Sequence, residues 1–338
     1  MKITTAIYSL GLALATAALA QEGERVTSDN FIRAETDNYF ANFVKQHGFG
    51  KLHHEREMTP IDHQTVIRMN RDTLYSFGVF DLDAGAVILT LPDPGKRYMS
   101  VVVINEDHYT PDMLYAPGKF TITKEKVGTR YVCLAMRTFA NPNDSVDMQA
   151  VQALQDKVKT EQQSAGTFTV PNWDQASLKK VREALLGVID AGGAFESSKM
   201  FGRKGEVDPV AHLLGTASGW GGNPKEAAMY AGGAVKENDG KAAYVLNFKD
   251  VPVDAFWSIS VYNKAGFFEK NDKNAYVFNS VTAKPNADGS FTIHFGGDEN
   301  AINYLPIMPG WNYAVRMYRP RKEILDGRWK FPEPQLVP

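Results

Sequence analysis

The segment Val66-Ile67-Arg68-Met69-Asn70-Arg71-Asp72-Thr73-Leu74-Tyr75 combines β-branched, aromatic and charged residues without proline or glycine. This composition predicts an extended strand, in which successive side chains point to opposite faces. Arg68, Asn70 and Asp72 would then share one face. Buried polar groups have to be paired. These residues therefore indicate either a structural Arg–Asp pair between strands or the lining of a cavity, and both interpretations stay open.

Strand-like runs continue downstream of this segment. They cover residues 74–82, 86–91 and 98–104, and turn residues at 83–85 and 92–95 separate them. This spacing predicts a β-meander. Its last strand ends just before Asp107-His108-Tyr109, where a carboxylate and an imidazole lie close together. Asp107 and His108 are therefore candidate catalytic residues, because reactive groups often lie on loops at strand ends.

Helical and further β patterns follow the same reasoning. A helix over 31–46 is expected, capped by Ser28 or Asp29 and closed by Gly48. Two more helices are expected, one over residues 145–165 and one from Asp174 to the Gly192-Gly193 stop. The apolar patterns also predict two strands within 118–137 and further strands from residue 241, with a hairpin turn at 286–289.

A glycine-dense segment surrounds Trp220. Asp208-Pro209 opens a short predicted helix that carries His212, and the chain then reads Gly219-Trp220-Gly221-Gly222-Asn223. Glycine lets the backbone approach another group closely. The segment is interpreted either as a helix–helix corner filled by Trp220 or as a ligand-facing loop with an aromatic wall.

The C-terminal part alternates apolar and polar residues. Trp257-Ser-Ile-Ser-Val-Tyr262 and the run around Arg316 are both typical of half-buried strands. Together with a loop that contains Arg56, these patterns give a set of candidate ligand-binding residues. The set is Arg56, Arg68, Asn70, Asp72, Tyr75, His212, Trp220, Tyr262 and Arg316.

Composition excludes several functional classes. The formal net charge is −2 and no Lys/Arg cluster is present, so nucleic acid is not an expected partner. The single cysteine, Cys133, cannot form an internal disulfide and is expected to be a small buried apolar residue. His53, His54 and Glu55 are adjacent and lack the spacing of metal ligands, so no metal site is predicted. No phosphate or dinucleotide loop points to a cofactor.

Residues 1–20 have the pattern of a secretory signal peptide. A lysine at position 2 precedes an apolar run that ends in Ala18-Leu19-Ala20. No other run reaches the roughly 18 apolar residues that a membrane span needs. The expected location is therefore the periplasm or the extracellular medium, and the oligomeric state stays open.

The chain resembles bacterial proteins that combine two domains of unknown function, numbered 1254 and 1214. The resemblance rests on Asn70-Arg71-Asp72-Thr73-Leu74-Tyr75, on the loop around Trp220, on Trp257 to Asn263 and on Leu325-Asp326-Gly327-Arg328-Trp329. It implies β-sandwich domains in an exported protein and assigns no catalytic residue. The expected class is mainly β (α+β), with two β-sandwich-like domains and a helical insert.

The expected division of the chain has four parts. They are a signal peptide (1–20), an N-terminal β domain (21–140), a helical insert (141–240) and a C-terminal β domain (241–338). A cleft where the two β domains meet is the expected place for a small ligand. Two functions stay open: metal-free acid–base catalysis on a small molecule or saccharide, and ligand binding or assembly without catalysis.

We predict that the exported protein begins at Gln21, because the small residues at positions 18 and 20 fit signal-peptidase cleavage. Mass spectrometry of the periplasmic fraction measures this directly. An intact Met1, or a mature start beyond Glu24, would contradict the prediction.

Overall fold

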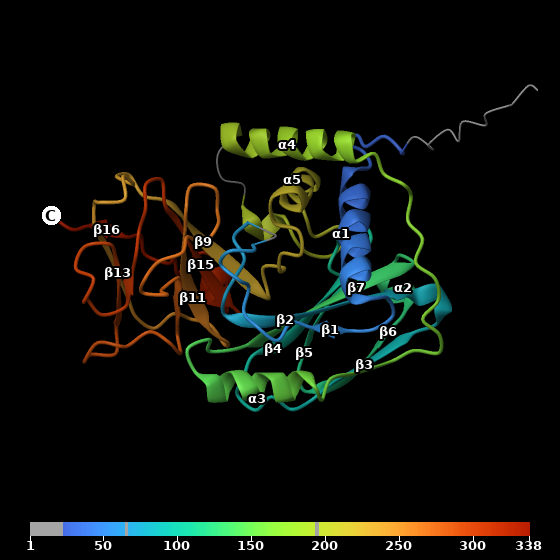
Figure 1. Ribbon diagram of the computed structural model, residues 1–338, viewed down its shortest axis with the longest axis horizontal. Coiled ribbons are helices and arrows are strands. Elements are labelled where there is room, and N and C mark those ends of the chain that lie inside the picture. The colour runs from blue at the N-terminus through green and yellow to red at the C-terminus, as the bar shows by residue number, and fades with distance from the viewer. Residues whose placement is uncertain (1–22, 65–66, 193–195) are drawn as a thin grey trace, which may run out of the picture.

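Residues 23–64, 67–192 and 196–338 are described by the computed structural model. The predicted signal peptide, Val66 and Gly193 lie outside these residues. The chain forms two β units side by side, with helices laid over the N-terminal unit and over the junction between the units (Figure 1). Within the described residues, no helix combines the length and apolar character needed to cross a bilayer.

The N-terminal unit contains two packed sheets. The larger has the order β1-β2-β7-β4-β5, and its strands are His53–His54, Thr73–Asp81, Tyr131–Phe139, Met99–Asn105 and Asp112–Tyr115. The smaller has the order β6-β3-β8, with strands Gly118–Ile122, Val87–Leu91 and Lys159–Glu161. All the pairings within these sheets are antiparallel.

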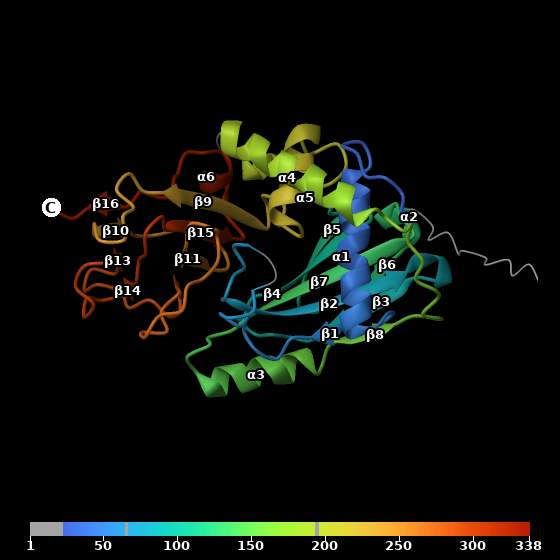
Figure 2. The same cartoon turned by 45° about the horizontal axis from the view of Figure 1, so that its top comes forward.

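Alternation along the central strands gives this unit two apolar layers. One face of the large sheet packs on the small sheet through residues that include Phe80, Leu89 and Leu134. The opposite face contributes Val79 and Cys133 to a second layer. Helix α1 (Phe31–His47) covers that second face (Figure 2). Its Phe40 belongs to the same apolar layer. The buried Cys133 fits the expectation from its position in an apolar strand.

The remaining helices are short or lie over the junction. They are α2 (Lys124–Val127), α3 (Ser145–Gln155), α4 (Gln175–Gly192), α5 (Pro209–Gly219) and α6 (Lys322–Leu325), with 3-10 turns at Leu82–Ala84 and Ser197–Lys199. Helix α4 lies across α1 and α5 and packs on both (Figure 1). The side chains of Asp174 and Asp208 cap α4 and α5 by accepting bonds from backbone N–H groups, as their positions predicted.

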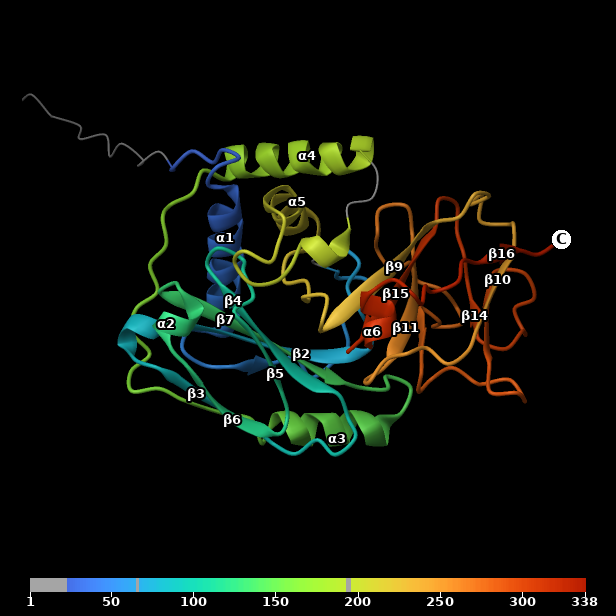
Figure 3. The same cartoon turned by 180° about the vertical axis from the view of Figure 1, so that it is seen from behind.

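The C-terminal unit also contains two sheets. One has the order β14-β13-β10-β16, with strands Tyr304–Leu305, Phe291–Phe295, Tyr244–Phe248 and Gln335–Leu336. The other has the order β12-β11-β15-β9, with strands Val277–Asn279, Trp257–Tyr262, Asn312–Tyr318 and Ala228–Ala234. Leu246, Ile259 and Val315 belong to the core between the sheets. The polar side of β11 and β15 consequently faces the N-terminal unit, and β9 reaches from α5 into this sheet (Figure 3).

The mainly β class with four sheets confirms the fold expected from the sequence. The helix expected over 31–46 is also confirmed, although it starts after Asn30 rather than after Ser28 or Asp29. Two strands lie within residues 141–240, which were expected to form the helical insert. These are β8, which joins the N-terminal unit, and β9, which joins the C-terminal unit.

Three local predictions are wrong. Residues 67–72 do not form a strand, because Arg68 has a φ of +51° and β2 begins only at Thr73. The meander is absent, since β2 and β4 both pair with β7 while β3 leaves for the smaller sheet. The helix expected over 145–165 ends at Gln155, because β8 then pairs with β3.

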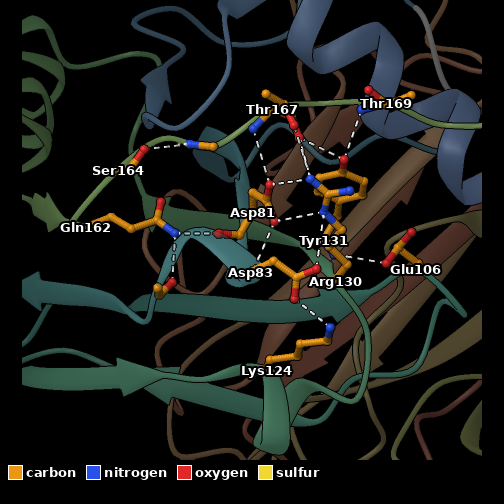
Figure 4. Close-up of polar contacts among 12 residues, drawn as sticks. Asp81, Asp83, Glu106, Lys124, Arg130, Tyr131, Gln162, Ser164, Thr167 and Thr169 are labelled. Carbon is orange, nitrogen blue, oxygen red and sulfur yellow. Dashed lines mark hydrogen bonds and ion pairs between the residues drawn. The ribbon is translucent and has the colours of Figure 1, made fainter.

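The segment that leads from β8 to α4 is held by a polar network (Figure 4). Arg130 donates to Asp81 at 3.0 and 2.7 Å and to the carbonyl of Thr167 at 3.2 Å. The amide of Gln162 bonds the carbonyl of Asp81 at 2.6 Å, and the hydroxyl of Tyr131 donates to the carbonyl of Thr167. The pKa of Asp81 is lowered by the bond from Arg130. This network fixes the path of the chain toward the helices over the junction.

The buried carboxyl of Asp37 on α1 links stability to pH. Its Oδ2 accepts a 2.9 Å bond from the indole of Trp173, while Oδ1 has no hydrogen-bond partner among the described residues. Burial raises the pKa of Asp37 from 3.8 to about 7, although the bond from Trp173 opposes that shift. The neutral form therefore contributes stability that is present at acid pH and is lost as the pH rises through about 7.

We expect Asp37→Asn to remove this pH dependence. Between pH 5 and pH 8 the wild type should lose roughly 2–3 kcal/mol of unfolding free energy through Asp37, and the variant should not. Urea unfolding at both pH values measures the difference. The exposed Asp29 gives the control Asp29→Asn. Equal pH slopes in wild type and Asp37→Asn would contradict the expectation.

Candidate binding cleft

A cleft of about 1330 Å³ lies between the two β units. Helix α1 and strands β2 and β7 supply its N-terminal wall, and β9 and β15 supply its C-terminal wall. The loop after α5 closes one end. The cleft therefore lies where the sequence predicted a ligand site, at the meeting of the two β units.

Two buried arginines, one from each unit, belong to the cleft lining. Arg137 on β7 donates to the carbonyl of Gly221 at 2.9 Å and to the side-chain oxygen of Asn223 at 3.1 Å. Arg316 on β15 donates to the hydroxyl groups of Tyr262 at 2.7 Å and Ser260 at 3.1 Å. Arg137 is 8% exposed and Arg316 is 5% exposed.

Neither arginine is neutralised by a carboxylate in contact with it. Their hydrogen-bond partners are hydroxyl, amide and carbonyl oxygens. Among the ion pairs of the described residues, none joins a carboxylate to Arg137 or to Arg316 within 4.0 Å. In addition, the Nε of Arg137 is buried and has no partner in the described part of the chain. Buried charges are normally paired, so this arrangement is unusual.

The charged groups of the lining are mostly positive. Five cationic side chains line the cleft: Arg68, Arg137, Arg182, Lys264 and Arg316. The lining carboxylate, Glu35, accepts a 2.7 Å bond from the Nε of Arg182 and so neutralises that residue. Arg68 is exposed, and its guanidinium forms no hydrogen bond or ion pair with another described side chain. The electrostatic environment therefore favours an anion.

A row of side-chain amides runs along the cleft side of α1. Asn38, Asn42 and Gln46 are spaced four residues apart, so they lie on one face of the helix. In the described structure these three amides have no side-chain hydrogen bonds, and Asn42 and Gln46 are exposed. Each can donate and accept, so the row can bind hydroxyl or carbonyl groups.

Aromatic rings form the rest of the N-terminal wall. Phe77 stacks on Phe43 at 4.6 Å between ring centroids and on Tyr75 at 5.5 Å. Trp220 stacks on Tyr39 at 4.3 Å. All five residues line the cleft, so a flat or ring-shaped ligand would meet aromatic faces there.

The glycine-dense loop fits both interpretations made from the sequence. Gly221 has a φ of +77°, donates its N–H to His108 and accepts the bond from Arg137. A Cβ on Gly222 would lie 2.3 Å from the ring of Phe201, so only glycine fits there. The loop is a tightly packed corner, and it also positions Arg137 and Trp220 at the cleft.

Five of the sequence-derived candidates line the cleft, and six do not. Those in the lining are Arg68, Asn70, Tyr75, Trp220 and Arg316. The others are Arg56, Asp72, Asp107, His108, His212 and Tyr262. The convergence of residues 68, 70, 75 and 316 comes from a loop that docks on the C-terminal sheet, and not from one face of a strand.

Asp107 and His108 lie outside the cleft lining. The Nε2 of His108 accepts the N–H of Gly221 at 2.8 Å, and its Nδ1 lies 2.8 Å from the hydroxyl of Thr216. Burial and the nearby His212 lower the pKa of His108 far below its ordinary value. Asp107 accepts two bonds from Arg33, at 3.0 and 2.6 Å. Both side chains thus hold neighbouring segments together.

The other candidates outside the lining also have clear partners. Arg56 pairs with Asp156 at 2.6 Å, and the two ring nitrogens of His212 lie near the carbonyls of Met200 and Asp107. Tyr262 lies beneath the cleft, where its hydroxyl donates to the carbonyl of Met69 at 2.8 Å.

Asp72 is buried, as expected, but its partner is not an arginine. Its Oδ1 accepts a 3.0 Å bond from the side-chain amide of Asn279 on β12. The structural Arg–Asp pair considered from the sequence is not formed among the described residues, because the turn at Asn70 directs Asp72 toward the C-terminal sheet. Burial raises the pKa of Asp72, while the bond from Asn279 opposes that shift.

Sequence reasoning missed Arg137, Tyr230, Tyr318 and the amides of α1. One signal was present for Arg137, since it is a charged residue within the apolar run 131–139. Tyr318 accepts a bond from Asn70, which is 248 residues away, and Tyr230 accepts one from Asn223 within the glycine-dense loop that precedes β9. The amides of α1 resemble an ordinary exposed helix face.

The fold and cleft define a class of two β-sandwich-like units with a helical cover. Residues 49–162 match the model described as Protein of unknown function (DUF1254), and residues 227–322 match that described as Protein of unknown function (DUF1214). The chain belongs to the family that combines these two domains, which confirms the resemblance found in its sequence. Among curated proteins, a search found no match to the chain.

Two solved structures share the fold. The VPA0106 protein of Vibrio parahaemolyticus aligns with a TM-score of 0.67 and 18% identity, over 92% of this chain and 98% of that one. A putative uncharacterized protein of Burkholderia cenocepacia aligns with a TM-score of 0.54 and 14% identity, over 91% and 86% of the two chains. At these identities the likeness establishes the fold alone.

We predict that Asp72 and Asn279 stabilise the protein jointly. Asp72→Ala leaves the Asn279 amide buried without its acceptor and should cost roughly 1–3 kcal/mol of unfolding free energy. Asp72→Asn keeps an acceptor and should cost less. The double variant Asp72→Ala/Asn279→Ala should cost clearly less than the sum of its single variants. Additive costs in chemical denaturation would show that the pair does not interact.

Proposed function

We propose that this protein binds a small anionic molecule in the cleft between its two β units. The observation that carries the proposal is the pair of buried guanidiniums, Arg137 and Arg316, which line the cleft without a carboxylate in contact. An anion bound in the cleft would supply the charge that neither has in direct contact, since Asp72 acts on Arg316 only through space. Arginine suits this role because its planar fork bonds carboxylate or phosphate oxygens in pairs.

The remaining lining supports a ligand with a polar, ring-shaped body. The amides of Asn38, Asn42 and Gln46 can bond several hydroxyl groups at once. The rings of Tyr75 and Phe77 offer apolar faces nearby. An acidic saccharide combines an anion, hydroxyl groups and an apolar ring face, so it is the ligand class that we propose.

The proposal favours binding over the acid–base chemistry considered from the sequence. That chemistry assigned proton transfer to Asp107 and His108, and both lie outside the cleft lining. Oδ1 of Asp107 is bonded to Arg33, and both ring nitrogens of His108 lie within hydrogen-bond distance of protein groups. We therefore assign these two residues a structural role. We further propose that the protein is exported, since residues 1–20 have the pattern of a signal peptide, which would place the cleft in contact with extracytoplasmic solutes.

The exposed Arg68 gives a direct test, because its side chain can be changed without removing a buried contact. Isothermal titration with D-glucuronate and with D-glucose compares an acidic sugar with a neutral one. We expect binding of the acid only, and an affinity lower by tenfold or more in Arg68→Gln, which corresponds to about 1.4 kcal/mol. The affinity of the wild type should also fall with salt.

Arg328→Gln provides the matched control, since Arg328 is an exposed arginine outside the cleft. It should bind the acid as the wild type does. Titration with further hexuronates and aldonates tests whether the cleft prefers a sugar acid of another stereochemistry. The proposal fails if no sugar acid binds, or if Arg68→Gln and Arg328→Gln bind equally well.

A further inference from the structure

A histidine–glutamate cluster lies at the C-terminal end of α1. His47 is the last residue of α1, His53 belongs to β1, and Glu55 follows β1. The Nε2 atoms of His47 and His53 lie 3.7 and 3.6 Å from the same Oε1 of Glu55. One possible ligand atom from each of the three residues lies within 4.8 Å of those of the other two.

The backbone around the cluster is anchored on both sides. Gly48 ends α1 with a φ of +91°, and its N–H bonds the carbonyl of Val44. His53 pairs with Phe77 of β2, and the N–H of Glu55 bonds the carbonyl of Tyr75 at 2.9 Å. The three side chains therefore project from a fixed frame, although the chain between them reverses direction.

We propose that His47, His53 and Glu55 bind a divalent transition metal ion of the zinc type. Two imidazole nitrogens and one carboxylate oxygen are a ligand set that Zn²⁺ favours, and three protein ligands leave a position open for water or another ligand. Ligand atoms in a tetrahedral zinc site are separated by about 3.3 Å, given metal–ligand distances near 2.0 Å. The nitrogen–oxygen distances of the cluster are a few tenths of an ångström longer.

Metal binding requires one adjustment. The rings of His47 and His53 are stacked at 4.0 Å with an angle of 15° between their planes, so their nitrogen lone pairs lie in nearly parallel planes. An ion in the plane of both rings needs one ring to turn. The side chain of His53 is 40% exposed and that of Glu55 is 45% exposed, so both have room to move. The terminal torsion of histidine is broad, which keeps the cost of turning low.

The arrangement is more than a surface ion pair. One histidine suffices to pair with Glu55, but here two rings in contact share a single carboxylate oxygen. Two protonated rings at this separation would repel each other.

The sequence did not predict this site, because the possible ligands were sought only among His53, His54 and the carboxylates next to them. The third ligand is His47, which belongs to a different element. The adjacent His54 does not take part, since its Nδ1 lies 2.7 Å from the hydroxyl of Ser76. The proposal is independent of the cleft ligand.

Titration of the full mature chain, without an affinity tag and after removal of metals by a chelator, tests the proposal. Calorimetry with ZnCl₂ should give one ion per chain with a Kd in the low micromolar range or tighter. CoCl₂ should give the visible absorption of a cobalt ion held by nitrogen and oxygen ligands. Both ions should raise the Tm.

His53→Ala and Glu55→Gln should weaken zinc binding by tenfold or more. His63→Ala removes an exposed histidine outside the cluster and should leave the affinity unchanged, as should His54→Ala. Should His53→Ala fail to fold, the more exposed Glu55→Gln still decides the matter. Zinc affinity weaker than about 100 µM in the wild type, or equal in His53→Ala, Glu55→Gln and His63→Ala, would overturn the proposal.

Discussion

The docking of residues 68–72 on the polar face of the C-terminal sheet holds the two β units together. Side chains of that sheet bond backbone atoms of the docked segment: Arg316 donates to the carbonyl of Arg68 at 2.6 Å, and Tyr262 donates to that of Met69 at 2.8 Å. Asn70 donates to the hydroxyl of Tyr318, and Asp72 accepts from Asn279. Because the segment has no strand partner, these bonds replace a β ladder as the source of its order.

The same contacts create the cleft. Arg316 is held in place by its bonds to Arg68 and Tyr262, so the guanidinium that faces the cavity is fixed by the joint between the units. On the opposite wall, the loop at Gly221 fixes Arg137 while His108 supports that loop from behind. The backbone of Arg68 is left-handed. Its carbonyl accepts the bond from Arg316, whereas its side chain is exposed at the cleft. Architecture and site therefore depend on one set of hydrogen bonds.

Much of the fold followed from local patterns, whereas the long-range pairings did not. Helix α1 and the caps at Asp174 and Asp208 were predictable, because capping and helical spacing act over a few residues. The pairing of β2 with β7 was missed, since a meander and a sheet with inserted strands have similar local alternation. The sequence identified those cleft residues whose polarity was unusual for their own segment, such as Asn70 and Arg316. The role of Arg137 and of the amides of α1 could not be predicted, because it depends on groups on the other side of the cavity.

An aromatic cluster at the same junction determines where the chain can be divided. Tyr98 and Phe139 from the N-terminal unit pack with Phe256 and Tyr318 from the C-terminal unit, and Tyr98 and Phe256 are 5.5 Å apart between ring centroids. A fragment ending between the two matched domains would expose these rings to water and lose the supports of residues 68–72. The two matched domains are therefore separate segments of the sequence that share one aromatic cluster, and we expect a polypeptide containing either half alone to aggregate.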